Sequence, residues 1–331
     1  MVAPVVVGED FAQRIARAAG PGAAVTRIDV MPGGHSGLTH RVGLDGLPGH
    51  AEIVVKSTPP GRDPVGRHDV LRQARIMDAL APIAGVPVPE VLFRDAGLPP
   101  FFGSSLAPGV AVDPVIDQDR TPMAAADVDA RWSAAVGVVT TLHALDPAAL
   151  GLGDEAPREP ATELAVWEAT MRAARYEDDP RAGRLITALA ADVPALERVA
   201  IVHGDFRLGN LLFDGATPTA LIDWEIWSLG EPAVELGWFL AFTDPENFPG
   251  VGRAVAGTPT ADDVLERYRA AGGALRAELP WFLALGCLKL AAIQAHNRRR
   301  HLDGRYHDPY QALLGPSIAR LLQKGLEHLG A

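Results

Sequence analysis

Cysteine is almost absent from this chain, which contains only Cys287 among its 331 residues. A single thiol cannot form an intrachain disulfide, and it cannot supply a CxxC metal site, because both features need a second cysteine. The sequence therefore excludes a disulfide framework and metal sites built from cysteine pairs. We expect the cytosol to be the natural compartment of such a protein.

Positive charge and long apolar runs are also scarce. Basic residues number 30 against 41 acidic ones, so the formal charge is −11, which opposes attraction to nucleic acid or an anionic membrane. The most apolar run, around Trp281, is broken by Lys289 before it reaches the roughly 18 to 20 residues of a membrane span. The N-terminus lacks the basic-then-apolar pattern of a signal peptide. We expect neither nucleic acid nor a membrane as a partner.

What is present is the composition of a globular protein, with 48% hydrophobic and 21% charged residues. The length predicts one large domain or two modest ones that share a core. The first hundred residues indicate an α+β lobe, in the order strand, Gly-rich turn, strand, turn, strand, helix, strand. A β-hairpin is expected from strands at 38–44 and 51–56 around Asp45-Gly46, and a helix at 69–80. We assign residues 1–103 to this N-terminal lobe.

Long amphipathic helices dominate the rest of the chain. We place the connection between the lobes in residues 100–109, where Gly, Ser and Pro cluster. Helices are predicted at 131–145, 162–176, 181–189, 262–271, 280–300 and 316–328, with a β-hairpin at 210–224. Residues 104–331 are thus expected to form a mainly helical C-terminal lobe.

The run HGDFRLGNLLFDGATPTALIDWE, residues 203–225, carries the chemistry. Asp205 and Asn210 reproduce the D-x-x-x-x-N spacing of a kinase catalytic loop, in which the Asp accepts the substrate proton and the Asn binds Mg²⁺. The predicted hairpin that follows should bring Asp223 back beside Asn210. One carboxylate and one amide oxygen suit Mg²⁺, which completes its coordination with phosphate oxygens and water.

These residues resemble the aminoglycoside and macrolide phosphotransferase family, whose mark is H-G-D-x-x-x-x-N followed by I-D-[FWY]-[DE]. Weaker matches lie at 32–42, 53–56, 85–92, 142–152 and 230–242, and together they look most like the kinase domain fused to some acyl-CoA dehydrogenases. The resemblance implies a protein-kinase-like bilobal α+β fold, with an N-terminal antiparallel sheet and one helix before a mainly helical C-terminal lobe. It also implies a phosphotransferase that uses ATP and Mg²⁺ and acts on a hydroxyl of a small molecule.

The resemblance further implies that Lys56 contacts the α- and β-phosphates and that the turn Gly33, Gly34, His35, Ser36, Gly37 covers the triphosphate. A lysine at the end of an apolar strand, after a Gly-rich turn, agrees physically with phosphate binding. One departure concerns the helix glutamate that pairs with this lysine in the family. Gln73 stands there, and it can still hydrogen-bond Lys56 but supplies no charge. Asp69, one turn earlier, is the alternative partner.

Several residues have a plain structural interpretation. His203 is expected to brace the catalytic loop, and Glu231 and Glu235 are expected to be capping and surface groups. Arg298–Arg300 could receive an anionic substrate or could close a long helix, whose last carbonyls favour cations.

Two questions about function stay open in the sequence. The acceptor could be an aminoglycoside, another small alcohol such as a macrolide or sugar, or a hydroxy acid or hydroxyacyl-CoA. Gln73 also supports a second class of function, an ATP-binding pseudokinase that regulates or scaffolds without phosphotransfer. The oligomeric state has no signature in the sequence.

Overall fold

A computed structural model describes residues 9–31, 37–117, 123–176, 179–305 and 308–331, and it divides the chain into two compact units. The N-terminal unit comprises residues 1–108 and 219–226, and the C-terminal unit comprises 109–218 and 227–331. These units are defined by contacts within the structure, and the expected division into an N-terminal lobe of residues 1–103 and a C-terminal lobe of residues 104–331 stays a prediction. What the sequence did not indicate is that residues 219–226, far along the chain, belong to the N-terminal unit.

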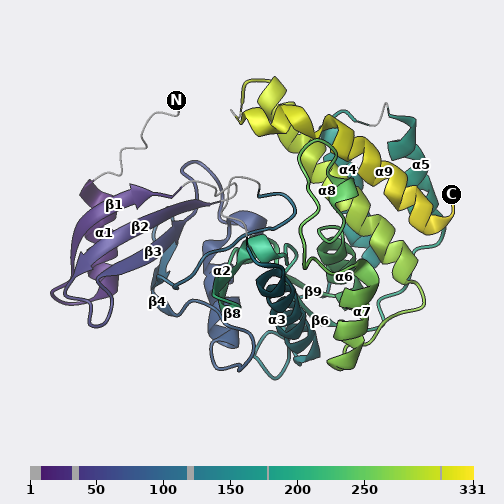
Figure 1. Ribbon diagram of the computed structural model, residues 1–331. Helices are drawn as coiled ribbons and strands as arrows, with labels where there is room; N and C mark the ends of the chain where they lie inside the picture. Colours follow the sequence, from purple (N-terminus) through teal and green to yellow (C-terminus); the bar gives the residue numbers. More distant parts are fainter. Residues whose placement is uncertain (1–8, 32–36, 118–122, 177–178, 306–307) are drawn as a thin grey trace. The chain divides into compact units, whose positions relative to one another are not determined.

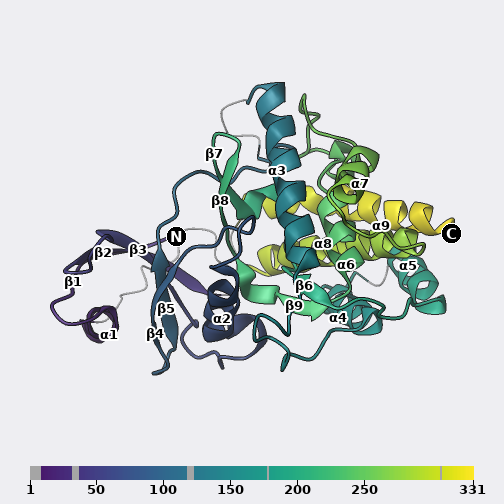
Figure 2. The same cartoon turned by 90° about the horizontal axis from the view of Figure 1, so that it is seen from below.

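The N-terminal unit is built on a five-stranded antiparallel sheet in the order β1-β2-β3-β5-β4 (Figures 1 and 2). The strands are β1 (Ala24–Val30), β2 (Leu38–Asp45), β3 (Glu52–Ser57), β4 (Val91–Asp95) and β5 (Phe101–Ser105). The predicted hairpin is confirmed as β2 and β3, with Thr39 opposite Lys56. β5 occupies the start of the segment that we assigned to the connection. It lies between β3 and β4, and its Phe101 and Phe102 are buried.

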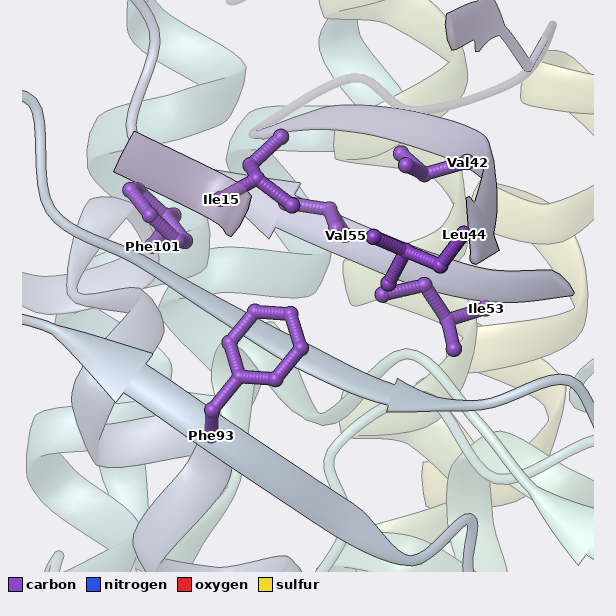
Figure 3. Close-up of a cluster of buried hydrophobic side chains, with 7 residues drawn as sticks. All are labelled: Ile15, Val42, Leu44, Ile53, Val55, Phe93 and Phe101. Atoms are coloured by element: carbon purple, nitrogen blue, oxygen red, sulfur yellow. The ribbon is translucent and has the colours of Figure 1, made fainter. Parts of the chain in front are cut away.

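Two helices accompany this sheet, α1 (Glu9–Ala19) and α2 (Val70–Leu80). α2 is the predicted helix, with Asp69 as its N-cap. α1 was missed, although Phe11, Ile15 and Ala18 recur at helical spacing. Figure 3 shows the core that results, in which Ile15 of α1 meets side chains from four strands. This cluster consists of Ile15, Val42, Leu44, Ile53, Val55, Phe93 and Phe101.

The C-terminal unit is mainly helical, as predicted. Its helices are α3 (Ala125–Ala144), α4 (Pro160–Ala173), α5 (Pro180–Ala191), α6 (Pro232–Leu240), α7 (Ala261–Ala270), α8 (Leu279–Leu302) and α9 (Gly315–Leu329). α3 begins earlier than its apolar pattern indicated, and α6 was not predicted, because a helix that is buried on every side has no amphipathic period.

Short elements connect these helices. β6 (Ala200–Val202) pairs with β9 (Ser228–Gly230), and β7 (Leu211–Asp214) with β8 (Thr217–Leu221), which is the predicted hairpin (Figure 2). The 3-10 helices are η1 (Gly66–His68), η2 (Leu208–Asn210), η3 (Trp224–Ile226), η4 (Pro245–Asn247) and η5 (Pro309–Leu314).

α8 is the central helix of the C-terminal unit and packs against α6 and α9. By length and composition it could also cross a membrane, but 72% of its most apolar window is buried inside the structure, which accounts for its apolar character. α6 and α8 approach so closely that a Cβ on Gly237 would meet the backbone carbonyl of Phe282, and one on Gly286 would meet the carbonyl of Gly237. Glycine at these two positions therefore fixes the distance between the helices.

We expect Gly237→Ala to lower the free energy of unfolding by about 2–3 kcal/mol, since the added methyl group must push two helix backbones apart. Gly183→Ala on α5 is the matched control, because a Cβ there meets nothing within 4 Å and the exchange should stabilise the helix by about 0.5–1 kcal/mol. Urea unfolding of both variants measures the difference. Equal stability of the two variants would contradict the close contact.

Candidate active site

Lys56 in the N-terminal unit forms ion pairs with two carboxylates of the returning segment 219–226. Its Nζ lies 2.8 Å from Asp223 Oδ1 and 3.8 Å from Glu225 Oε2, and its side chain is 12% exposed. The alternation of β3 explains this placement, because Val55 and Ser57 are buried on the face opposite to Lys56. Sequence reasoning found Lys56 and Asp223 but missed Glu225, although it stands in the same Asp-Trp-Glu motif.

Neither of the two candidate partners on α2 reaches Lys56. The Gln73 side chain is buried, and its Nε2 donates to the carbonyl of Arg67 at 3.4 Å. The Asp69 carboxylate caps α2 by accepting from the backbone N–H of Arg72 at 3.0 Å. Lys56 thus has charged partners in Asp223 and Glu225 in place of a helix glutamate.

The glycine-rich turn is described only at its end. Gly33, Gly34, His35 and Ser36 lie outside the described residues, so their contact with a triphosphate stays a prediction. Gly37 is buried, and a Cβ added there would lie 3.2 Å from Cε of Lys56. The absence of a side chain at this position therefore leaves room for the lysine.

Asp223 has an unusual backbone conformation, with φ at 69°, in the left-handed region that few non-glycine residues adopt. The surrounding segment is held in place, since Trp224 Nε1 donates to the carbonyl of Leu221 at 2.9 Å and Leu221 N donates to the carbonyl of Pro87 at 2.7 Å. Backbone strain of this kind concentrates at functional sites. It is consistent with the role expected of Asp223.

The catalytic loop, residues 203–210, lies in the C-terminal unit between β6 and β7. Asn210 Nδ2 donates to both Oδ2 and the backbone carbonyl of Asp205, each at 2.8 Å. The structure therefore brings together the two residues that the D-x-x-x-x-N spacing indicated. Within the described part of the chain, Asp205 Oδ1 accepts no hydrogen bond and is screened from solvent.

Arg207 and Asp113 extend this cluster, and neither was found from the sequence. Arg207 Nη1 lies 2.9 Å from Asp113 Oδ2, and its Nε lies 3.5 Å from Asp205 Oδ1. Burial raises the pKa of Asp113 to about 6 against the opposing charge of Arg207. Burial also disfavours the charge of Arg207, but the carboxylates of Asp205 and Asp113 outweigh it and raise the pKa of the guanidinium. Arg207 stands inside the motif and could have been singled out, whereas Asp113 lies 94 residues away.

Buried side chains hold the backbone of the loop. His203 braces the loop as expected, because its Nδ1 accepts from the N–H of Asp205 at 3.1 Å. Glu235 accepts from the N–H groups of His203 at 2.9 Å and Gly204 at 2.7 Å, and His143 Nε2 lies 3.3 Å from it. Burial alone would raise the pKa of Glu235, but the hydrogen bond and charge of His143 lower it. The carboxylate is thus held as an anion that accepts from the loop.

The expectation that Glu231 and Glu235 are surface groups is wrong. Both are buried, and Glu231 accepts from Arg276 at 2.9 Å and from the N–H groups of Glu197 and Arg198. The two carboxylates can be buried away from solvent because each accepts several hydrogen bonds from the protein. Arg299 lies in the last turn of α8, and its Nε pairs at 3.1 Å with Asp303, the C-cap of that helix, as in the structural interpretation of Arg298–Arg300.

The donor atoms predicted for Mg²⁺ fit that ion by type. Asn210 uses its Nδ2 on Asp205, which leaves the amide oxygen for a cation, and Asp223 supplies a carboxylate. Among the described residues no group of three or more His, Cys, Asp or Glu side chains could hold a metal by itself. Mg²⁺ does not need such a cage, since it is commonly held by one or two protein ligands together with phosphates and water.

Comparison with known sequences agrees with this chemistry. The model of the phosphotransferase enzyme family matches residues 28–282. Acyl-CoA dehydrogenase family member 10 of Mus musculus is 30% identical over 279 residues, which are 77% of this chain and 25% of that protein. Member 11 of Homo sapiens is 26% identical over 299 residues, 84% of this chain and 37% of that protein. The chain therefore spans well under half the length of these relatives.

Solved structures share the fold. A Ralstonia eutropha JMP134 protein provisionally described as an aminoglycoside phosphotransferase has a TM-score of 0.77 at 23% identity and covers 96% of each chain. Macrolide 2′-phosphotransferase type I has a TM-score of 0.63 at 18% identity, over 95% of this chain and 98% of that one. An aminoglycoside phosphotransferase solved with AMP-PNP and hygromycin B has a TM-score of 0.61 at 16% identity, over 96% of this chain and 99% of that one. These likenesses confirm the predicted protein-kinase-like α+β fold.

The raised pKa of Asp113 predicts a pH-dependent stability. Between its unfolded pKa of 3.8 and about 6, folded Asp113 binds its proton more tightly than the unfolded chain does, so its contribution to stability falls as pH rises through this window. Between pH 4 and pH 7, the free energy of unfolding of Asp113→Asn should therefore rise by up to about 3 kcal/mol relative to that of wild type, as measured by urea unfolding. Asp214→Asn, at the exposed end of β7, is the control. If the difference in free energy of unfolding between Asp113→Asn and wild type does not change with pH, or falls as pH rises, burial does not raise the pKa of Asp113.

Proposed function

Because the chain belongs to the phosphotransferase enzyme family, we propose that it is a small-molecule kinase that transfers the γ-phosphate of Mg·ATP to a hydroxyl group, with Asp205 as the catalytic base. In phosphoryl transfer the protein itself takes little part in covalent chemistry. It needs a carboxylate to orient and deprotonate the attacking hydroxyl, together with positive charge around the phosphates.

The observation that carries the proposal is the state of the Asp205 carboxylate. Oδ2 is fixed by Asn210, while Oδ1 is screened from solvent without accepting a hydrogen bond in the described part of the chain. A buried acceptor oxygen without a hydrogen bond is costly, and a hydroxyl that donates to Oδ1 would remove that cost. Arg207, at 3.5 Å from Oδ1, is itself held by Asp113, so the charge beside the base is shared between two carboxylates.

The remaining roles follow from donor chemistry. We assign Lys56 and the turn Gly33–Gly37 to the phosphates, and Asn210 and Asp223 to Mg²⁺. The ion would neutralise charge that develops on the β- and γ-phosphates. Since Lys56 is paired with Asp223 and Glu225, it enters the reaction as a fixed charge and loses little freedom when it meets a phosphate.

Two acceptor classes deserve direct comparison. Solved relatives include an aminoglycoside phosphotransferase bound to hygromycin B and a macrolide phosphotransferase, whereas the curated sequence relatives are members of the acyl-CoA dehydrogenase family. The second group favours a hydroxy acid or hydroxyacyl-CoA acceptor, and the first favours an amino sugar or macrolide. Our proposal is limited to a hydroxyl of a small molecule.

Incubation of the protein with Mg·ATP and a panel that covers both acceptor classes should yield a phosphorylated compound detectable by mass spectrometry. Asp205→Asn should lower turnover of that compound by about two orders of magnitude or more, with ATP affinity nearly unchanged, because the base acts only in the transition state. Nucleotide binding without turnover of any acceptor would favour the pseudokinase function. Equal losses of turnover and ATP affinity would contradict the role of Asp205 as base.

Asp223→Ala should weaken Mg²⁺-dependent nucleotide binding, since it removes a metal ligand and the main partner of Lys56. Calorimetric titration of ATP with and without Mg²⁺ measures this effect, with Asp214→Asn, at the exposed end of β7, as a carboxylate control. Unaltered metal dependence in Asp223→Ala would remove this residue from the site.

A further inference from the structure

Lys289 is a buried cation that the proposed chemistry does not use. It lies on α8 with 3% of its surface exposed, and burial lowers the pKa of its ammonium group against the attraction of Glu163, Asp205 and Glu235. The chain has only three lysines, Lys56, Lys289 and Lys324. A buried ammonium is costly unless it is hydrogen-bonded, so the contacts of Lys289 indicate what it stabilises.

Those contacts lead to the catalytic loop. Lys289 Nζ donates a hydrogen bond to the carbonyl oxygen of Gly204, the residue immediately before the proposed base. Two indole rings face the same ammonium, that of Trp238 with its centroid at 4.5 Å and that of Trp167 at 5.1 Å. Cation–π attraction from both rings holds the charge in place where water is excluded.

The peptide between Gly204 and Asp205 is thereby held at both of its polar atoms. Its carbonyl oxygen accepts from Lys289, and its N–H donates to His203 Nδ1 at 3.1 Å. The peptide before it is fixed as well, because Glu235 accepts the N–H of Gly204. Gly204 has φ at 86°, a conformation open to glycine, so without these bonds the peptide plane could rotate at little cost.

We propose that Lys289 is a positioning residue that sets the orientation of the Gly204–Asp205 peptide and so directs the Asp205 carboxylate toward its substrate. The inference rests on the proposed role of Asp205. The direction of the Cα–Cβ bond of Asp205 follows from the plane of the preceding peptide, and a displacement of even 1 Å at a reacting group is expensive in rate.

The packing of α6 against α8 fixes the position of Lys289 relative to the catalytic loop. Glu235 is on α6 and Lys289 on α8, and the close approach of Gly237 and Gly286 fixes the spacing of these two helices near both residues. The N–H groups of the loop are therefore held from α6 and its carbonyl from α8. A methionine at 289 would fill a similar volume but would leave the carbonyl of Gly204 without its donor.

The first test needs no acceptor. Hydrogen exchange of peptides that cover residues 201–212 is compared in wild type, Lys289→Met and Lys324→Met, where Lys324 is a half-buried lysine of α9 that lies 3.5 Å from Asp244. We expect exchange of the Gly204 and Asp205 amides to rise roughly tenfold in Lys289→Met and to stay unchanged in the control. Wild-type protection in Lys289→Met would overturn the proposal.

The second test separates positioning from general stability. With the acceptor found in the panel, Lys289→Met should lower kcat by roughly 10- to 100-fold and leave the KM for ATP within about twofold, whereas Lys324→Met should match wild type. A fall in kcat that only follows the loss of folded protein would overturn the proposal. If no acceptor is phosphorylated, the proposed function fails, but the exchange comparison still decides whether Lys289 holds the loop.

A measurement on the wild-type protein covers the case in which Lys289→Met does not fold. In a protein labelled with ¹⁵N-lysine, the side-chain signals come from three lysines. Lys324→Met and Lys56→Met assign two of them, and the third then belongs to Lys289. The Lys289 ammonium protons should exchange with water at least about tenfold more slowly than those of Lys324, because they are buried and bonded to Gly204. Equal exchange rates would overturn the proposal.

Discussion

The buried carboxylate of Glu235 is the constraint on which the catalytic loop depends. It accepts the N–H groups of His203 and Gly204, so two successive peptides of the loop are fixed to α6. Its own negative charge is supported by His143, which in turn contacts the hydroxyl of Tyr268 at 2.9 Å. A charge with this many partners can remain buried. It fixes to the helical core a stretch of the loop, residues 203–207, that belongs to no helix or strand.

Charge is arranged differently in the two units. In the N-terminal unit, one lysine is held by two carboxylates, which suits the phosphate contact that we propose for it. In the C-terminal unit, Arg207 lies between two carboxylates, 2.9 Å from Asp113 Oδ2 and 3.5 Å from Asp205 Oδ1, so its charge is not directed at the proposed base alone. Each unit therefore carries its own cluster of opposite charges, and the proposed phosphoryl transfer assigns a part to each of them.

Much of the fold was readable because local patterns agree with it. The β2–β3 hairpin, α2 and the long helices α8 and α9 follow from turn residues and apolar spacing, and the D-x-x-x-x-N spacing correctly joined Asp205 to Asn210. α6 was missed because it is buried all round, and β5 was missed because its Gly and Ser residues resemble a linker. Glu235 was misplaced for a related reason, since a glutamate in a sequence gives no sign that backbone amides will enclose it.

The sequence by itself determined a local arrangement: the spacing of Asp205 and Asn210 places them side by side in one short loop, and local motifs led us to assign both, with Lys56, to the proposed phosphotransfer. Tertiary structure decided which distant residues support them. Glu225 in place of Gln73 as a partner of Lys56, Asp113 beside Arg207, and Lys289 beneath Gly204 are contacts between segments far apart in sequence. Such contacts depend on how helices and strands pack, and packing leaves no periodic signal at the residues that it brings together.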